Sequence, residues 1–272
     1  MPVPFLLGIY IAVLGLMVGS YLNVVIYRLP RGLSTVMPRS RCPGCEAPIR
    51  ALDNIPLVSF LFLGGRCRHC RTPISWQYPL TELATGLLFV ACYARFGLTL
   101  DALAGALFCA LMLALAAIDF EHFLLLDRLT LPGIAIGLLV QPLLGWAGSF
   151  GAPLPWGRFL AGLWGAALGA GILLAVVKGW YLLRKEEGMG LGDVKMLALI
   201  GAFLGWKGVL VCLFFASLSG AVVGLALILA RRGAGFKTQL PFGVFLALGG
   251  LITLFFGEAI AAFYGGLLAP PG

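Results

Sequence analysis

The sequence predicts an all-α polytopic membrane protein with about eight transmembrane helices and one small soluble module. Hydrophobic residues make up 61% of the 272 residues and charged residues only 11%, whereas a soluble domain is about half apolar and about a quarter charged. The apolar residues form runs of about 20, the length that an α-helix needs to cross a bilayer. Basic residues gather between alternate runs, as they do in cytoplasmic loops.

The apolar runs define the expected helices. We expect spanning helices at residues 4–27, 77–95, 99–118, 129–147, 157–180, 194–206, 208–230 and 241–265. The sixth run is short, and its boundary with the seventh falls at Lys207-Gly208. Eight spans put both termini outside, and the inner segments then hold 16 of the 19 lysines and arginines, all except Arg95, Arg158 and Lys207. Because this topology explains the net charge of +8, we exclude a nucleic-acid partner.

These spans divide the chain into three parts. Residues 1–27 form the first helix, residues 28–76 a hydrophilic cytoplasmic module, and residues 77–272 a seven-helix membrane domain. Glycine pairs four residues apart occur at Gly15 and Gly19, Gly165 and Gly169, Gly201 and Gly205, and Gly220 and Gly224. Small residues at this spacing let helix backbones approach closely. We expect these pairs to pack inside one bundle rather than between two molecules, and we see no internal repeat.

The hydrophilic module contains two CxxC pairs. They are Cys42-Pro43-Gly44-Cys45 and Cys67-Arg68-His69-Cys70, with 21 residues between them. Two such pairs supply four thiolates, which complete a tetrahedral zinc shell. A module of about 50 residues buries only a small hydrophobic core, so its fold needs a bound metal ion for stability. We therefore expect a zinc-ribbon-like module with one structural zinc ion at Cys42, Cys45, Cys67 and Cys70. A redox dithiol pair is the alternative.

Polar side chains interrupt the apolar runs on both sides of the module. Asn23 lies near the inner end of the first helix, and Glu82 lies in the second, within Tyr78-Pro79-Leu80-Thr81-Glu82. A glutamate near a helix N-terminus can be stabilised by the helix dipole alone. A role in binding a substrate or cofactor is the alternative for Glu82, and both readings stay open.

Acidic residues gather where two apolar runs reach the cytoplasmic side. Asp119 ends the third run, and Asp193 follows two glycines in Gly190-Leu191-Gly192-Asp193. Charge beside a bilayer is costly and indicates function. Two carboxylates from separate helices can hydrolyse a peptide bond, one as the acid and the other as the base. We identify Asp119 and Asp193 as the candidate catalytic pair.

The residues around this pair have more ordinary explanations. Asp127 is expected to be the N-cap of the following helix, and Glu121 is expected to lie in a solvated turn. Gly190 and Gly192 allow a peptide backbone to approach closely. Lys195 is expected to pair with a carboxylate or with lipid headgroups.

These motifs together resemble those of a known family. The matching stretches are Gly19 to Pro30, the two CxxC pairs with Asp53-Asn54-Ile55-Pro56 between them, Tyr78 to Glu82, Ile118-Asp119 through Asp127-Arg128-Leu129-Thr130, and Gly190 to Lys195. The chain resembles the type IV prepilin peptidases, which are bifunctional leader peptidases and N-methyltransferases of the bacterial inner membrane. It departs from the family at Leu126-Asp127, where the family usually reads Pro-Asp, and at Glu121, where Asp is common.

The resemblance implies an aspartic endopeptidase with Asp119 and Asp193 as its catalytic pair, zinc at the four cysteines and S-adenosylmethionine as methyl donor. The expected substrate is a type IV prepilin or a type II secretion pseudopilin. Its short basic leader would be cut at the cytoplasmic face, and the new N-terminal residue would then be methylated. The zinc module and active site are expected in the cytoplasm and both termini in the periplasm. The oligomeric state is left open.

The position of the methyl-donor site is less evident from the sequence. No glycine-rich Rossmann fingerprint follows a strand, so the candidates are Asn23, Asp53 and Glu82, in the module and at adjoining helix ends. A peptidase without methyl transfer is the nearest alternative. A transporter with a cytosolic zinc module is a second alternative, although acids near the bilayer midplane and repeated halves, which many transporters have, are not evident in the sequence. A non-enzymatic assembly factor that carries a zinc module is the third, and it would leave Asp119 and Asp193 without a role.

Overall fold

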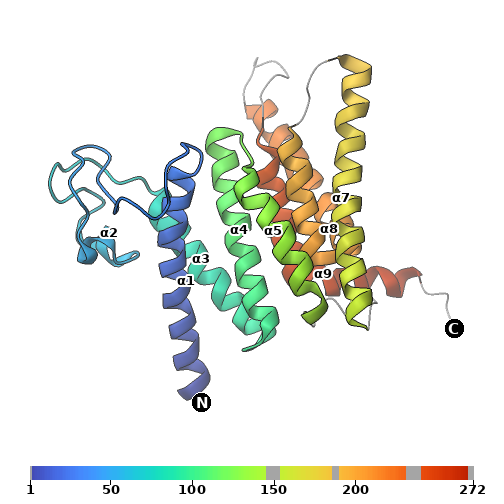
Figure 1. The fold of residues 1–272 in the computed structure, drawn as a ribbon, viewed down its shortest axis with the longest axis horizontal. Coiled ribbons are helices and arrows are strands. Elements are labelled where there is room, and N and C mark those ends of the chain that lie inside the picture. Colours follow the sequence, from blue (N-terminus) through green and yellow to red (C-terminus); the bar gives the residue numbers. More distant parts are fainter. Residues whose placement is uncertain (1, 145–153, 186–189, 231–239, 269–272) are drawn as a thin grey trace. The chain divides into compact units, whose positions relative to one another are not determined.

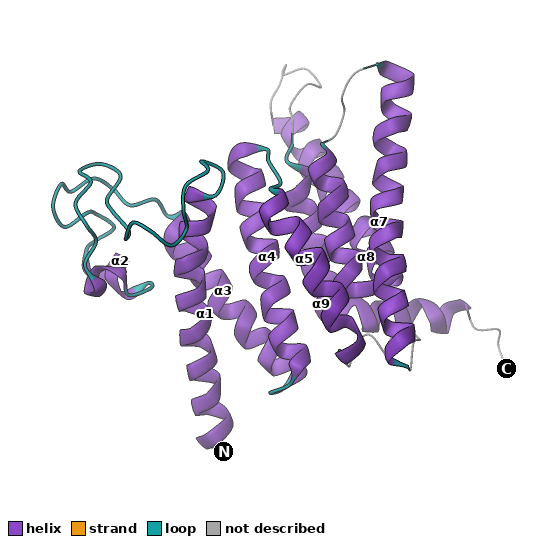
Figure 2. Cartoon of the chain, viewed as in Figure 1, coloured by secondary structure: helices purple, strands orange, loops and turns teal. Residues whose placement is uncertain are grey.

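The computed structural model describes residues 2–144, 154–185, 190–230 and 240–268 (Figure 1). Within these ranges the chain consists of helices and loops, with two isolated β-bridges in the cysteine module and no strand (Figure 2). The predicted all-α class is therefore confirmed.

The helices belong to two compact units, Met1–Ala114 and Leu115–Gly272. The elements in chain order are α1 (Pro2–Arg28), η1 (Ala51–Asn54), α2 (Val58–Phe62), α3 (Gln77–Phe96), α4 (Leu100–His122), α5 (Asp127–Val140), η2 (Gln141–Leu143), α7 (Pro155–Arg184), α8 (Leu191–Ala230) and α9 (Phe242–Leu268). The division between the units falls inside α4. Unit 1 carries the cysteine module between α1 and α3, and unit 2 carries the acidic residues Asp119 and Asp193.

Five helices in the described part of the chain are long and apolar enough to cross a membrane. These helices are α1, α4, α7, α8 and α9. The predicted count of eight also included α3 and α5, and it divided α8 into two helices. α8 covers 40 residues, but its backbone is not helical at Gly205, where φ is 71° and ψ is 178°, so it consists of two helices that meet at a kink. The two predicted runs, 194–206 and 208–230, are thus two helices, and their boundary lies at Gly205 and not at Lys207-Gly208. α5 ends at Val140, and residues 145–147 of the predicted helix 129–147 lie outside the described residues.

In unit 1, α1 and α3 lie side by side because glycines leave no side chain between them (Figure 1). A Cβ placed on Gly15 would lie 2.9 Å from the Cα of Gly86, and one on Gly19 would lie 2.7 Å from the Cα of Glu82. Larger residues would force the two helices apart. The predicted packing role of Gly15 and Gly19 is confirmed.

In unit 2, the first half of α8 is the central helix, and its residues from Met196 to Gly205 are all buried. α7 crosses α8 at Gly165 and Gly201, where a Cβ on either glycine would strike the backbone of the other helix. The predicted close packing is confirmed at this crossing. At Gly220 and Gly224 a Cβ would meet side chains at 3.5 and 3.6 Å, which is ordinary van der Waals contact. Packing therefore does not require glycine at those two positions.

Candidate active site and metal centre

Two carboxylates from separate helices come together inside unit 2. Asp119 lies in the last turn of α4, and Asp193 lies in the first turn of α8. The two residues are only 5% and 8% exposed, and their carboxylates are close enough for the charges to interact. A buried carboxylate pair of this kind can hold one proton and serve as acid and base.

The N-terminus of α9 encloses the carboxylate of Asp119. This carboxylate interacts with the backbone amides of Gly243 and Val244. They belong to the first turn of α9, whose amides have no partner within the helix, and a helix N-terminus stabilises negative charge. A Cβ on Gly243 would lie 2.7 Å from Oδ2 of Asp119. Glycine is therefore the residue that leaves room for the carboxylate.

Oδ2 of Asp119 is buried and has no hydrogen-bond partner of normal geometry among the described residues. An unpaired buried polar atom costs about 1–3 kcal/mol, so a water or substrate group that bonds to it would be favoured. Gly243, which lies against Oδ2, is not among the residues predicted from the sequence. The available signal was a glycine directly after Pro241-Phe242, at the start of the last apolar run.

Leu125, in the loop between α4 and α5, lies between two glycines of the site. A Cβ on Gly192 would lie 2.7 Å from the Cβ of Leu125, and a Cβ on Gly243 would lie 3.2 Å from its Cδ1. For Gly190 the nearest atom would be 3.8 Å away, which is an ordinary contact. Of the two glycines before Asp193, Gly192 is therefore the one that packing requires.

Asp127 pairs with Lys195 and does not cap α5. The N-cap of α5 is Leu126, no side chain caps the helix, and Asp127 is its first residue. Oδ1 of Asp127 lies 2.6 Å from Nζ of Lys195. The predicted N-cap is therefore wrong, because a cationic lysine is a stronger partner than a backbone amide. The expected pairing of Lys195 with a carboxylate is confirmed, and Glu121 is exposed beside His122, as expected for a solvated turn.

The four cysteines of the module converge on one point. The Sγ atoms of Cys42, Cys45, Cys67 and Cys70 all lie within 4.8 Å of one another. The Sγ atoms of Cys42 and Cys70 are 3.7 Å apart. Four thiolates at about 2.3 Å from a tetrahedral zinc ion would be about 3.8 Å apart. The group therefore fits a metal ion of this kind.

The two CxxC pairs are held by the same backbone pattern, repeated 25 residues later. The equivalent positions are Cys42 and Cys67, Glu46 and Arg71, Ala47 and Thr72, and Pro48 and Pro73. The N–H of each first cysteine donates to the carbonyl oxygen five residues later, at 3.0 Å in the first pair and 2.9 Å in the second. A short repeat thus exists where none was predicted, and the shared spacing R-C-x-x-C-x-x-P-I was its signal.

Two family models match the chain. Residues 13–96 match the bacterial peptidase A24 N-terminal domain, and residues 106–225 match the type IV leader peptidase family. The chain belongs to the type IV leader peptidase family.

Relatives in this family are similar over most of their length. The prepilin leader peptidase/N-methyltransferase of Burkholderia pseudomallei is 41% identical, over 93% of this chain and 87% of the relative. The protein of the same name from Myxococcus xanthus is 43% identical, over 86% and 67%. The one from Pseudomonas aeruginosa is 39% identical, over 92% and 91%. No solved structure matches the chain.

In this leader peptidase family member, two of the three residues predicted to bind the methyl donor form hydrogen bonds with other parts of unit 1. Nδ2 of Asn23 donates to the carbonyl oxygen of Tyr78 at 3.0 Å. Oε2 of Glu82 accepts a hydrogen bond from the N–H of Leu57 at 2.8 Å. Both side chains therefore have structural partners.

Asp53, the third candidate, forms a bidentate ion pair with Arg68 inside the module. Nε and Nη2 of Arg68 donate to the carboxylate at distances of 2.6–3.1 Å. The hydrogen bonds from Arg68 hold the pKa of Asp53 below its usual value. Arg68 lies between the second pair of cysteines, so this contact ties the segment between the two pairs to the metal centre.

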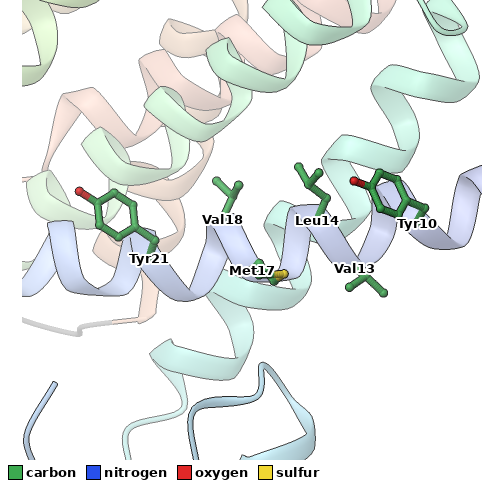
Figure 3. Close-up of a pocket in the computed structure, with 6 residues that line it drawn as sticks. All are labelled: Tyr10, Val13, Leu14, Met17, Val18 and Tyr21. Atoms are coloured by element: carbon green, nitrogen blue, oxygen red, sulfur yellow. The ribbon is translucent and has the colours of Figure 1, made fainter. Parts of the chain in front are cut away.

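A shallow apolar hollow lies along one face of α1 (Figure 3). Its lining residues are Tyr10, Val13, Leu14, Met17, Val18 and Tyr21. It contains none of the candidate site residues. α1 is long and apolar enough to span a membrane, and such a face suits the acyl chains of lipids.

Proposed function

We propose that this protein cleaves the leader of a type IV prepilin or a type II secretion pseudopilin and then N-methylates the new N-terminal residue. The name shared by its relatives, prepilin leader peptidase/N-methyltransferase, supports both activities. The observation that carries the peptidase half is the buried pair of Asp119 and Asp193 beside the first turn of α9.

The proposed cleavage is aspartyl hydrolysis by this pair. Two close carboxylates hold one proton between them, so one is ionised and the other is an acid. The ionised carboxylate takes a proton from water as the water oxygen attacks the scissile carbonyl carbon. The acid then protonates the leaving amine as the C–N bond breaks. The proton taken from water replaces the proton given to the amine, so the pair ends with one proton, as it began.

The setting of the pair suits the proposed substrate class. A prepilin presents a short basic leader to the cytoplasm and an apolar helix to the bilayer. Asp119 lies in the last turn of α4 and Asp193 in the first turn of α8, so both are at ends of helices that can span a membrane. We place this end, together with the module, on the cytoplasmic side of the inner membrane, and both termini in the periplasm. The basic residues of the module support this orientation.

We assign residues 28–76 to a zinc module that serves methyl transfer and residues 77–272 to the peptidase, with residues 1–27 as a membrane anchor. Four thiolates fill the zinc shell, so the ion has a structural role. S-adenosylmethionine supplies the methyl group when it is bound. Asn23, Asp53 and Glu82 remain its candidate contacts in unit 1, although each already has a partner within the chain.

The peptidase half is tested by cleavage of a purified prepilin in detergent or membranes. Wild type, Asp119→Asn and Asp193→Asn would be compared, with helix content and thermal unfolding measured for each. Cleavage by the wild type and loss of at least about a thousandfold in both variants, as for other residues that act as a catalytic unit, is the expected result. Full activity in either folded variant would exclude the carboxylate-pair mechanism.

The methyltransferase half needs a separate measurement. Transfer of labelled methyl from S-adenosylmethionine to cleaved pilin should occur with the wild type and with Asp193→Asn given pre-cleaved pilin. A peptidase without methyl transfer is the second candidate function, favoured by the intrachain partners of Asn23, Asp53 and Glu82. Absence of transfer by the wild type, with normal cleavage, would establish that alternative.

A further inference from the structure

Glu82 is a buried carboxylate that links three segments of unit 1. It lies on α3 and is 8% exposed. Its Oε2 accepts a hydrogen bond from the N–H of Leu57 at 2.8 Å, and the side chain of Ser20 on α1 interacts with the carboxylate. The backbone of Glu82 lies against Gly19, so α1 and α3 pack closely at this residue.

Leu57, whose amide Glu82 holds, has an unusual backbone conformation. Its φ is 59° and its ψ is −47°, a region that residues other than glycine rarely adopt. Leu57 precedes α2 and follows the stretch Asp53 to Pro56, which lies between the two cysteine pairs. Such a conformation persists only where its surroundings impose it, and the hydrogen bond to Glu82 supplies one such constraint.

A second contact fixes the two ends of the module beside each other. Asn23, in the last turns of α1, donates to the carbonyl oxygen of Tyr78 in the first turn of α3 at 3.0 Å. The chain leaves α1 for the module after Arg28, five residues beyond Asn23, and enters α3 at Gln77, directly before Tyr78. Glu82 then adds a contact to the middle of the module, at Leu57, which the ends alone would leave free to move.

We infer that Glu82 is a positioning residue that fastens the cysteine module to α1 and α3 through the amide of Leu57. In this role Glu82 acts through the module, and the role does not depend on a contact between Glu82 and the methyl donor. The inference rests on the proposed function in one respect, the assignment of the module to methyl transfer. Loss of the anchor therefore lowers methyl transfer and leaves leader cleavage, which depends on unit 2, unchanged.

The test compares purified full-length wild type, Glu82→Ala and Glu82→Gln, with Glu46→Gln as an exposed control inside the module. Amide hydrogen exchange at Leu57, zinc content, leader cleavage and methyl transfer are measured on the same preparations. In Glu82→Ala, exchange at Leu57 should rise at least about tenfold, because a hydrogen bond to a charged group is lost. Methyl transfer should fall at least about tenfold, as expected when a reacting group is misplaced.

The conservative variant separates positioning from simple destabilisation. The amide oxygen of Glu82→Gln still accepts the N–H of Leu57, so this variant should keep most of the protection and most of the methyl transfer. Zinc content and cleavage should match the wild type in every variant. If Glu82→Ala does not fold, Glu82→Asp keeps the charge but shortens the side chain, and should show the same increase in exchange.

Three results would overturn the inference. Unchanged exchange at Leu57 in folded Glu82→Ala would remove the anchor. Faster exchange with normal methyl transfer would remove the positioning role. Equal loss of cleavage and methyl transfer would show that Glu82 supports the whole protein. If the wild type transfers no methyl group, the proposed methyltransferase fails, while the exchange at Leu57 still decides whether Glu82 is the anchor.

Discussion

Nζ of Lys195 lies 2.6 Å from Oδ1 of Asp127. The contact joins the first turn of α8, two residues after Asp193, to the first residue of α5, eight residues after Asp119. The two segments that carry the candidate catalytic carboxylates are thus connected by a direct ion pair. The side chains are 35% and 55% exposed, so the pair contributes little to global stability and its main effect is on local geometry.

Breaking this ion pair should lower leader cleavage without unfolding the protein. Asp127→Asn and Lys195→Met should each reduce kcat about tenfold through small displacements of the carboxylates, while changing the free energy of unfolding by about 1 kcal/mol or less. The exchanged pair, Asp127→Lys with Lys195→Asp, should recover part of the rate. Lys178→Met, an exposed lysine on α7, is the control. No recovery in the exchanged pair would indicate that the charges act separately.

The two glycines before Asp193 should tolerate alanine differently. Gly192→Ala places a Cβ 2.7 Å from the Cβ of Leu125, whereas the new Cβ of Gly190→Ala would have no neighbour closer than 3.8 Å. We expect Gly192→Ala to reduce cleavage about a hundredfold, because Asp193 must shift, and Gly190→Ala to have a much smaller effect. Gly171→Ala on α7, which would meet nothing within 4 Å, controls for the added methyl group. Equal loss in both motif variants would point to backbone contact with substrate instead.

Gly243→Ala should impair cleavage through Asp119. The added Cβ would lie 2.7 Å from Oδ2 of Asp119 and would push the carboxylate away from the amides of α9. We expect kcat to fall about a hundredfold and to be limited by chemistry in single-turnover experiments. KM for the prepilin should change little, because Gly243 meets the catalytic group and not the substrate helix. A rise in KM with unchanged kcat would place Gly243 in substrate binding.

The crossing of α7 and α8 predicts a large stability effect. Gly201→Ala places a Cβ against the backbone of Gly165, where no flexible side chain can move aside. Overpacking of this kind costs about 1–3 kcal/mol. Thermal unfolding in detergent should therefore occur at a lower temperature for Gly201→Ala than for wild type or Gly171→Ala. An unchanged midpoint would show that α7 can shift without cost.

Removal of a cysteine from the metal centre should release the zinc. Cys70→Ser leaves three thiolates, and we expect bound zinc to fall from about one equivalent to a small fraction. The arginines of the module should then become more sensitive to trypsin, because the module has little other core. Cys92→Ala, a buried cysteine of α3 outside the module, should keep its zinc. Retention of zinc by Cys70→Ser would show that another residue can replace the thiolate.

Local patterns in the sequence were sufficient for several features of this protein. The apolar runs predicted helices because a bilayer leaves the backbone few other ways to satisfy its hydrogen bonds. The two CxxC pairs predicted one four-thiolate centre because spacing sets where such side chains can point. Asp119 and Asp193 were identified because a charge beside a bilayer is costly and indicates a role. Each of these inferences depends on residues near one another in the chain.

The tertiary structure decided the features that depend on contacts between distant segments. Whether Asp127 caps α5 or binds Lys195 depends on where α8 lies, and whether α8 is one helix or two depends on the backbone at Gly205. The contact of Gly243 with Asp119 and that of Glu82 with Leu57 join residues that the sequence keeps far apart. Periodicity and spacing report only short-range geometry, whereas packing selects which buried polar groups find one another.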